Sequence, residues 1–532
     1  MKHLSSKYLA VILLVAMSLV IAACSNDSTP ELITEEPTSQ TTAEDVQIGV
    51  ASDPVSLDPH GANEAVANTI NAAIYDGLVY LDSNSNIQLR LAENLEQIED
   101  TVWEAKIREG VYFHDGSELN AEAVKLSLDR VRDPEVASPV AFLFGMVTEV
   151  RVVDEYTVHI ETEFPFAPLP SHLAHTAGSI ISPTLIEQSY EDLANGGNPF
   201  AAVNEHPSGT GSFKFESQDP GNSVSLSNNE EYWGEDAANV DKLTFRVIPE
   251  SATRIAELET GGIDINLTVF PSDITRLESN TETKVQQINS ARLAYLGFNT
   301  EVEPFDDVNV RRAIHMAIDK DALVQGIIDG AGIPAHGPIS PRINGYSDNI
   351  NSIEYDLEEA KSLLAEAGYA DGFDVTLLTD DNRERQDLAV ALQAQLSELG
   401  ITVSIDTYEY GTYLERAGLG QSEIFLGSWG TVTLDADYGL YPVFHSDNVG
   451  APGNRSRIVN AELDELLEAA RQESDYKTRV NLYEEVQNKL ADESPYAYLY
   501  FPDNLSSVRS EVEDFWQYPS GYFYVRDVRM NK

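Results

Sequence analysis

Hydrophobic and polar residues alternate along this chain with two different periods, which predicts strands and helices in alternation. A short strand is expected over residues 111–113, followed by turn residues at 114–117. Asn120 is the expected cap of the next helix, whose apolar stripe is Val124, Leu128 and Val131. Another helix is expected after Asp306 or Asp307, with its stripe at Val310, Ala313, Ile314 and Ala317. This alternation indicates an α/β fold.

Residues 356–407 carry the clearest pattern. Asp356 and Glu359 have the spacing of a capping box, and Gly368 is placed to end the helix that they begin. A buried strand over residues 373–379, a helix over 386–399 and a second strand over 401–407 then predict a βαβ unit with parallel strands.

Charged residues gather where ligands bind in such sheets, beyond the carboxyl ends of the strands. Arg383 and Arg385 follow the first of these strands, at the start of the helix. A further strand, residues 424–426, leads into Gly-Ser-Trp-Gly at 427–430 and then to Asp435 and Asp437. We therefore expect cationic and anionic groups to meet in one cleft.

The N-terminus has the features of an export signal. Lys2 and Lys7 precede a short apolar stretch over residues 9–23, which is below the roughly 20 residues that cross a bilayer. Ile-Ala-Ala-Cys at 21–24 resembles a bacterial lipoprotein box, so we expect cleavage after residue 23 and a lipid on Cys24, the single cysteine of the chain. The alternative is an ordinary signal peptide. Residues 25–45 are rich in Ser, Thr, Pro and acids, which predicts a flexible tether and a fold that starts near Val46.

Net charge excludes one class of partner. The 532 residues include 88 acids and 34 lysines and arginines, a formal charge of −54, and such a field repels nucleic acid. Two or three domains are expected from this length. We interpret the charge as an adaptation to a saline or alkaline habitat.

This interpretation predicts that the protein is more stable in salt. The Debye length falls from about 8 Å at 0.15 M to about 3 Å at 1 M, so the repulsion between carboxylates weakens. The melting temperature, followed by circular dichroism, should rise between dilute buffer and about 1 M sodium chloride. An unchanged melting temperature would contradict the interpretation.

Several motifs resemble those of the family 5 extracellular solute-binding proteins, which serve ABC importers of peptides, nickel and related solutes. The resemblance is strongest over residues 106–130, in Ile-Arg-Glu-Gly-Val-Tyr-Phe-His-Asp-Gly-Ser at 107–117 followed by Leu-Asn-Ala-Glu-Ala-Val at 119–124. Further family-like stretches are found at 57–59, 75–78, 209–213, 296–300, 311–314, 427–430 and 493–496. Together they span the chain from Val46 to the C-terminus.

The resemblance implies a two-lobed clamp of the periplasmic-binding-protein type (type II, large form), with an extra subdomain in the first lobe. Lobe I is expected to comprise residues 46–290 and 503–532, with the subdomain at about 80–200, and lobe II residues 291–502. The hinge would lie where the chain crosses between lobes, near 294–299 and 498–503.

The resemblance also implies roles for the charged residues. In peptide-binding relatives, an aspartate after the Gly-Trp motif takes the ligand's ammonium, and Asp435 or Asp437 matches that loop. In dipeptide-binding relatives, an arginine near the start of the helix that corresponds to residues 386–399 takes the ligand's carboxylate. This points to Arg385 or Arg383. Trp429 and Gly430 would line the pocket. On the residues alone, the arginines also fit a solvated surface, and Trp429 fits the core as well as it fits a pocket wall.

The resemblance leaves the ligand open between a short peptide and glutathione, with a nickel chelate, haem or a sensing role as alternatives. The partners implied are ABC permease subunits, and we expect a monomer anchored outside the cytoplasmic membrane. An enzyme is not expected, because the sequence has no nucleophile elbow and no His-Glu-x-x-His motif. No cofactor or metal is expected, and His172 and His175 are interpreted as structural because no further histidine or cysteine is near.

Overall fold

The structure is a computed structural model that describes residues 44–234 and 238–531. The described residues form one compact unit. The first strand begins at Asp45, next to the predicted start of the fold. The predicted signal peptide and Cys24 lie outside the described residues.

The main sheet joins twelve strands of the described residues in the order β16-β15-β17-β13-β18-β11-β1-β10-β9-β8, with β12 and β14 also paired to β18. Its strands are β1 (Asp45–Val50), β8 (Phe213–Asp219), β9 (Ser223–Asn228), β10 (Lys242–Val247), β11 (Ile265–Asn266), β12 (Thr283–Asn289), β13 (Arg292–Phe298), β14 (Gly332–Pro334), β15 (Asp374–Asp380), β16 (Thr402–Tyr408), β17 (Ile424–Gly430) and β18 (Tyr496–Arg509).

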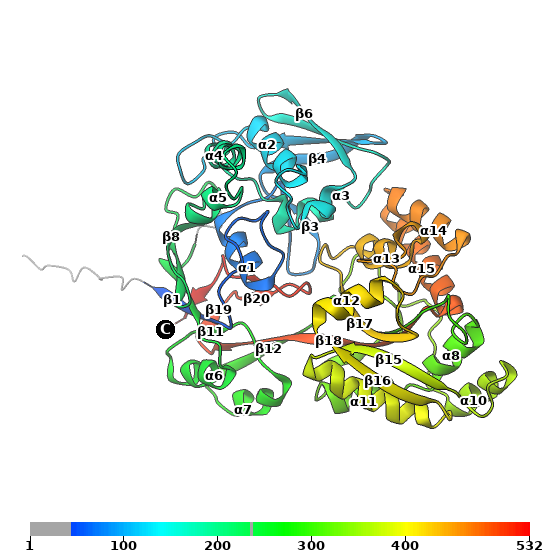
Figure 1. Cartoon of the computed structure of the whole chain (residues 1–532). Helices are drawn as coiled ribbons and strands as arrows, with labels where there is room; N and C mark the ends of the chain where they lie inside the picture. The colour runs from blue at the N-terminus through cyan, green and yellow to red at the C-terminus, as the bar shows by residue number, and fades with distance from the viewer. Residues whose placement is uncertain (1–43, 235–237, 532) are drawn as a thin grey trace, which may run out of the picture. The chain divides into compact units, whose positions relative to one another are not determined.

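Strand β18 changes partners along its length. Its first half, as far as Pro502, pairs with β13 and β14. From Asp503 onward it pairs with β12 and β11. Figure 1 shows β18 as one long strand that continues from the neighbourhood of β17 to that of β12. One strand therefore supplies hydrogen bonds to two groups of strands.

Smaller sheets accompany the main one. An antiparallel sheet in the order β4-β5-β7-β6 lies within the segment predicted to be a subdomain. The strands of the smaller sheets are β2 (Val79–Leu81), β3 (Ile87–Leu89), β4 (Ala92–Glu99), β5 (Val102–Ile107), β6 (Val147–Asp154), β7 (Thr157–Thr162), β19 (Val512–Glu513), β20 (Trp516–Gln517), β21 (Phe523–Tyr524) and β22 (Arg529–Met530).

The α-helices of the described residues are α1 (Ala65–Ile74), α2 (Ala121–Arg132), α3 (Leu169–Leu173), α4 (Pro183–Ala194), α5 (Ala201–Glu205), α6 (Ser251–Thr260), α7 (Ile274–Glu278), α8 (Val308–Met316), α9 (Lys320–Ile327), α10 (Leu357–Glu366), α11 (Arg383–Ser397), α12 (Tyr410–Gly418), α13 (Ala436–Phe444), α14 (Ala461–Gln472) and α15 (Tyr476–Glu493). Within these residues, no helix combines the length and the apolar character needed to cross a membrane.

Three predicted caps begin helices in the structure. The side chains of Asn120 and Asp356 each accept a hydrogen bond from the third residue of their helix, α2 and α10, and Asp307 accepts one from the second residue of α8. Such caps satisfy backbone N–H groups that have no partner within the helix. The predicted starts of these helices are confirmed.

Three predicted elements differ from the structure. Residues 111–113 form no strand, and Tyr112 makes only an isolated bridge to Glu118. Helix α11 begins at Arg383, three residues before its predicted start, because Asn382 accepts a hydrogen bond from the Arg385 backbone N–H. Strand β17 continues through residues 427–430, which pair with β13 along their whole length.

Two cores lie on opposite faces of strands β13, β15 and β17. Leu296, Leu377 and Leu426 pack with apolar residues of helices α8, α10 and α11. Tyr295 and Phe425 point to the other face, which is covered by α12, α13, α14 and α15. These two layers hold the three strands in place, including the edge of the sheet where the predicted site residues are found.

Candidate functional site

Three strand ends meet at one edge of the main sheet. Strands β15 and β17 are parallel, so both end there, at Asp380 and Gly430. The antiparallel strand β13 begins there, with Arg292 opposite Gly430. The parallel βαβ unit is confirmed, since β15 and β16 pair in parallel on either side of α11. This edge is where α/β sheets bind ligands.

Arg385 is fixed at this edge by strand and helix residues. Its Nη1 donates to Asp380 Oδ2 at 2.5 Å, and its Nη2 donates to Ser428 Oγ at 3.2 Å. The guanidinium lies 5.7 Å from the ring centre of Tyr410 and 5.8 Å from that of Tyr413. The side chain is 20% exposed, so it is shielded but reachable. A guanidinium held in this way is suited to a carboxylate.

Arg383 lies apart from this group. Its side chain is 95% exposed and its nearest carboxylate is Asp387, one helical turn away, at 3.7 Å. This is the solvated arrangement that the sequence left open for both arginines. The structure therefore separates two residues that the sequence does not distinguish.

Trp429 and Gly430 are the last residues of β17. The Trp429 indole donates Nε1 to the carbonyl oxygen of Tyr438 at 2.9 Å and stacks on the Tyr438 ring at 5.5 Å. Tyr438 stacks in turn on Phe142, in the segment between α2 and β6, at 5.9 Å. Gly430 is exposed and a Cβ there would meet no atom within 4 Å. The Trp429 ring is half-buried, and its role as a pocket wall stays a prediction.

Asp435 and Asp437 lie at the start of α13 and are buried. Asp435 caps the helix and forms a two-pronged ion pair with Arg479 of α15, at 2.5 and 2.8 Å. Asp437 forms a similar pair with Arg471 of α14, with both distances 3.1 Å. Their exposures are 2% and 3%. Each carboxylate thus has an arginine of the protein itself, and the predicted role as ligands for an ammonium stays a prediction.

Arg471 also joins α14 to a distant segment. Its guanidinium lies 3.5 Å from the ring centre of Tyr441 and 5.0 Å from that of Phe164. Its carbonyl oxygen accepts from the Ala167 backbone N–H at 3.0 Å. Sequence reasoning missed Arg471 and Arg479, and no local signal marks them, because their acids lie 34 and 44 residues away.

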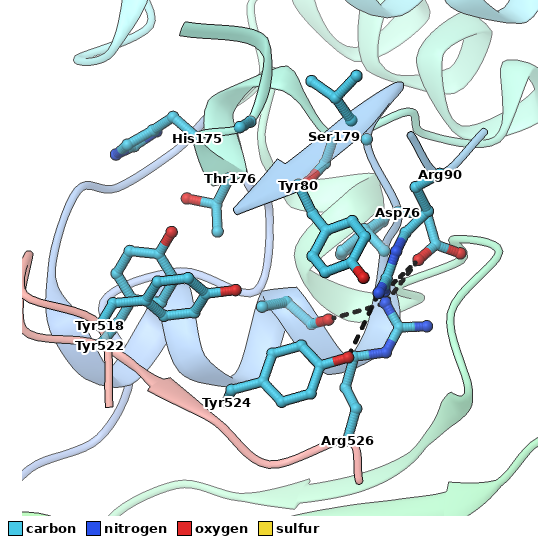
Figure 2. A pocket seen from close by; sticks show the side chains of 15 residues that line it. Asp76, Tyr80, Arg90, His175, Thr176, Ser179, Tyr518, Tyr522, Tyr524 and Arg526 are labelled. Atoms are coloured by element: carbon cyan, nitrogen blue, oxygen red, sulfur yellow. Dashed lines mark hydrogen bonds and ion pairs between the residues drawn. The ribbon is translucent and has the colours of Figure 1, made fainter. Parts of the chain in front are cut away.

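A buried carboxylate with two arginines lies beside a small cavity near the C-terminal segment. Arg526 and Arg90 donate to Asp76 Oδ1 at 2.5 and 3.3 Å, and Thr210 donates to Oδ2 at 2.9 Å. Burial alone would raise the pKa of Asp76, but the two guanidinium groups outweigh burial and lower this pKa to about 2. Figure 2 shows these contacts next to the cavity.

Tyrosines form much of the wall of this cavity, whose volume is about 40 Å³. Tyr518, Tyr522 and Tyr524 come from the C-terminal segment, and Tyr80 lies under the Arg90 guanidinium at 3.9 Å (Figure 2). Burial raises the pKa of Tyr518 and of Tyr522, so both hydroxyls are neutral donors. Sequence reasoning missed this wall, although the six aromatic residues of segment 515–524 are a visible signal.

A larger cavity, of about 490 Å³, opens beside β14 and β18. Its apolar wall includes Ile333, Ile339 and Phe501, and its polar residues include His336 and Glu354. The size falls within the range of about 300–1,000 Å³ that small-ligand sites occupy. The cavity is therefore large enough for a small ligand, but none of the residues predicted for the site lines it.

The two histidines at 172 and 175 are buried packing residues. His172 shares a hydrogen bond of 2.6 Å between Nδ1 and the Leu143 carbonyl oxygen, and His175 accepts from the Ala177 backbone N–H. Burial lowers the pKa of both, that of His175 to about 3. Within residues 44–234 and 238–531, no group of three or more potential metal ligands is found.

Comparison with known proteins assigns the chain to a family. The model of the bacterial extracellular solute-binding proteins, family 5 (middle), matches residues 86–451. The glutathione-binding protein GsiB of Shigella flexneri is 30% identical over 493 residues, which cover 91% of this chain and 94% of that protein. GsiB of Salmonella typhi is 31% identical with the same coverage.

Solved structures share the fold. HbpA2 of Haemophilus parasuis superposes with a TM-score of 0.83 at 29% identity, covering 91% of this chain and 99% of its own. The periplasmic binding protein DppA of Helicobacter pylori, in complex with the peptide STSA, has a TM-score of 0.76 at 29% identity, covering 92% and 99%. The predicted fold class, an α/β two-lobed periplasmic-binding-protein fold, is confirmed. The chain belongs to the bacterial family 5 extracellular solute-binding proteins and is the binding component of an ABC importer, not an enzyme.

Proposed function

We propose that this protein captures a short peptide, or glutathione, outside the cytoplasmic membrane and delivers it to ABC permease subunits. The observation that carries the proposal is the identity of 30–31% to glutathione-binding proteins over more than nine tenths of both chains. The complex of the 29% identical DppA with the peptide STSA supports the wider peptide class.

Within this proposal, the ligand lies at the edge where β15, β17 and β13 meet, and Arg385 binds its carboxylate. Shielding to 20% exposure and the supporting contacts from Asp380 and Ser428 favour Arg385 over Arg383. Trp429 and Gly430 border the same edge. Asp435 and Asp437 remain the proposed partners of the ammonium, which would share their oxygens with Arg479 and Arg471.

The proposed lobes are residues 46–290 with 503–532, and residues 291–502. The change of partners along β18, between Pro502 and Asp503, supports this division. Closure of the lobes over the ligand would be a hinge motion that the ligand favours by binding the closed form more tightly. We also propose that the protein is a monomer held at the membrane by a lipid on Cys24.

Calorimetric titration tests the proposal. Glutathione, dipeptides and tetrapeptides are titrated into protein that has been unfolded, dialysed and refolded to remove retained ligand. We expect at least one of them to bind with a dissociation constant in the micromolar range or tighter, about 8 kcal/mol or more. Binding of a nickel chelate or of haem, with no heat from any peptide, would contradict the proposal.

A further inference from the structure

The small cavity beside the C-terminal segment is lined by more positive than negative charge. Among the residues that the structure describes, its charged lining consists of Arg90, Arg526 and Asp76, which are 8%, 3% and 1% exposed. Asp76 is ionised, because the two guanidinium groups hold its pKa at about 2. His175 also lines the cavity but is neutral, because burial lowers its pKa to about 3. The buried charges therefore sum to one positive charge in excess.

Hydrogen-bond donors also outnumber acceptors in the wall of this cavity. Arg90 donates to Asp76 Oδ1 and to the Tyr524 hydroxyl, each at 3.3 Å (Figure 2). These bonds leave three of the five N–H groups of its guanidinium without an acceptor in the described residues. In the same part of the chain, the hydroxyl hydrogens of Tyr80 and Tyr524 have no acceptor either. Buried donors without partners are costly, so an acceptor from outside the chain would stabilise this wall.

The size of the cavity limits what can enter it. Its volume is about 40 Å³, and one water molecule needs about 10–15 Å³ of such a volume, so two or three groups of that size fit. A whole amino-acid residue is too large. Water would accept hydrogen bonds from the wall but would leave the excess charge without a counter-charge. A small anion supplies both the acceptor and the opposite charge.

We propose that this cavity binds a small monovalent anion, which accepts hydrogen bonds from Arg90 and from the hydroxyls of Tyr80 and Tyr524. A chloride ion and a carboxylate group share the required chemistry. The overall charge of −54 repels anions from the rest of the molecule, so only a local excess of guanidinium groups attracts one. Arg385 and the other residues predicted for the peptide site do not line this cavity. The inference therefore does not rest on the proposed function.

Chlorine-35 NMR of the full chain tests the inference, because the chloride signal broadens when the ion exchanges with a protein site. We expect broadening that saturates with chloride in the millimolar range and that sodium formate, the smallest carboxylate, reverses by displacement. Arg90→Gln should abolish this broadening. Tyr524→Phe, which removes a single hydroxyl, should weaken chloride binding about tenfold, the effect of one hydrogen bond to a charged group.

Arg529→Gln is the matched control for these variants. Arg529 lies in the same C-terminal segment as Arg526, but it is 59% exposed and pairs with Asp514 at 2.8 Å, so its loss should leave the broadening unchanged. Melting temperatures show whether each variant is folded, and Tyr524→Phe still tests the site if Arg90→Gln does not fold.

The relative affinities of the two probes identify the source of the anion. Displacement of chloride by formate at a lower concentration than that of the chloride would assign the cavity to a carboxylate group, and displacement only at a higher concentration would assign it to chloride. Absence of saturable broadening in the unaltered protein would overturn the inference. Broadening of equal strength in Tyr524→Phe and the unaltered protein would overturn it as well, because the anion would then be bound elsewhere.

Discussion

Replacement of Arg385 by glutamine is expected to weaken the binding of a short peptide by about a hundredfold or more, since removing one member of a shielded ion pair costs about 3 kcal/mol. The guanidinium is held by Asp380 and Ser428 at the edge where three strands meet. Glutamine keeps much of the length of the side chain but cannot supply the charge or the paired donors. Calorimetric titration of the peptide that binds the unaltered protein measures the loss.

Arg383→Gln is the matched control for this experiment. Both arginines lie in the first turn of α11, but the side chain of Arg383 is 95% exposed and that of Arg385 is 20% exposed. We expect the affinity of Arg383→Gln to stay within about twofold of the original, as is usual for exposed charges. Equal losses in the two variants would show that the charge of the helix start, and not the position of Arg385, attracts the ligand.

Asp435→Asn is expected to lower the free energy of unfolding by about 3–5 kcal/mol, because it leaves the buried guanidinium of Arg479 without its counter-charge. Burial disfavours the charge of Arg479, but Asp435 outweighs burial and raises the pKa of that guanidinium. The two groups are joined by hydrogen bonds of 2.5 and 2.8 Å, and Arg479 also donates to the Tyr483 hydroxyl at 2.9 Å. Urea unfolding followed by tryptophan fluorescence measures the change.

The double variant Asp435→Leu with Arg479→Met provides the control. It removes both charges together, so it should be much more stable than Asp435→Asn, as found when buried ion pairs are replaced by apolar groups. One other outcome would assign Asp435 to the ligand instead. If Asp435→Asn had the same free energy of unfolding as the original protein but no longer bound the peptide, the Asp435 carboxylate would bind the ligand's ammonium, as the family resemblance implies.

The sequence allowed local features of the fold to be predicted where a single residue decides the structure. Asn120, Asp307 and Asp356 each cap a helix through their own side chain, so the start of each helix depends on that residue. Helix α11 begins three residues before its predicted start, because Asn382 caps it by accepting a hydrogen bond from the Arg385 backbone N–H. Residues 427–430 have no strand pattern, and only their pairing with β13 makes them part of β17.

The candidate site could be predicted only in part. The edge of the sheet follows from the βαβ pattern, and Arg385, in the first turn of α11, lies at this edge and donates to Asp380 at the end of β15. The partners of Asp435 and Asp437 could not be found in this way, because ion pairs over 34 and 44 residues depend on the packing of α13 against α14 and α15.

The long strand β18 has a consequence for how the protein is made. It occupies residues 496–509 of 532, and both groups of strands in the main sheet need it. Neither group can therefore be completed until nearly the whole polypeptide has left the ribosome, although domains often fold during synthesis. A nascent chain that stays incomplete for so long remains available to a secretion channel, which suits a member of an extracellular protein family.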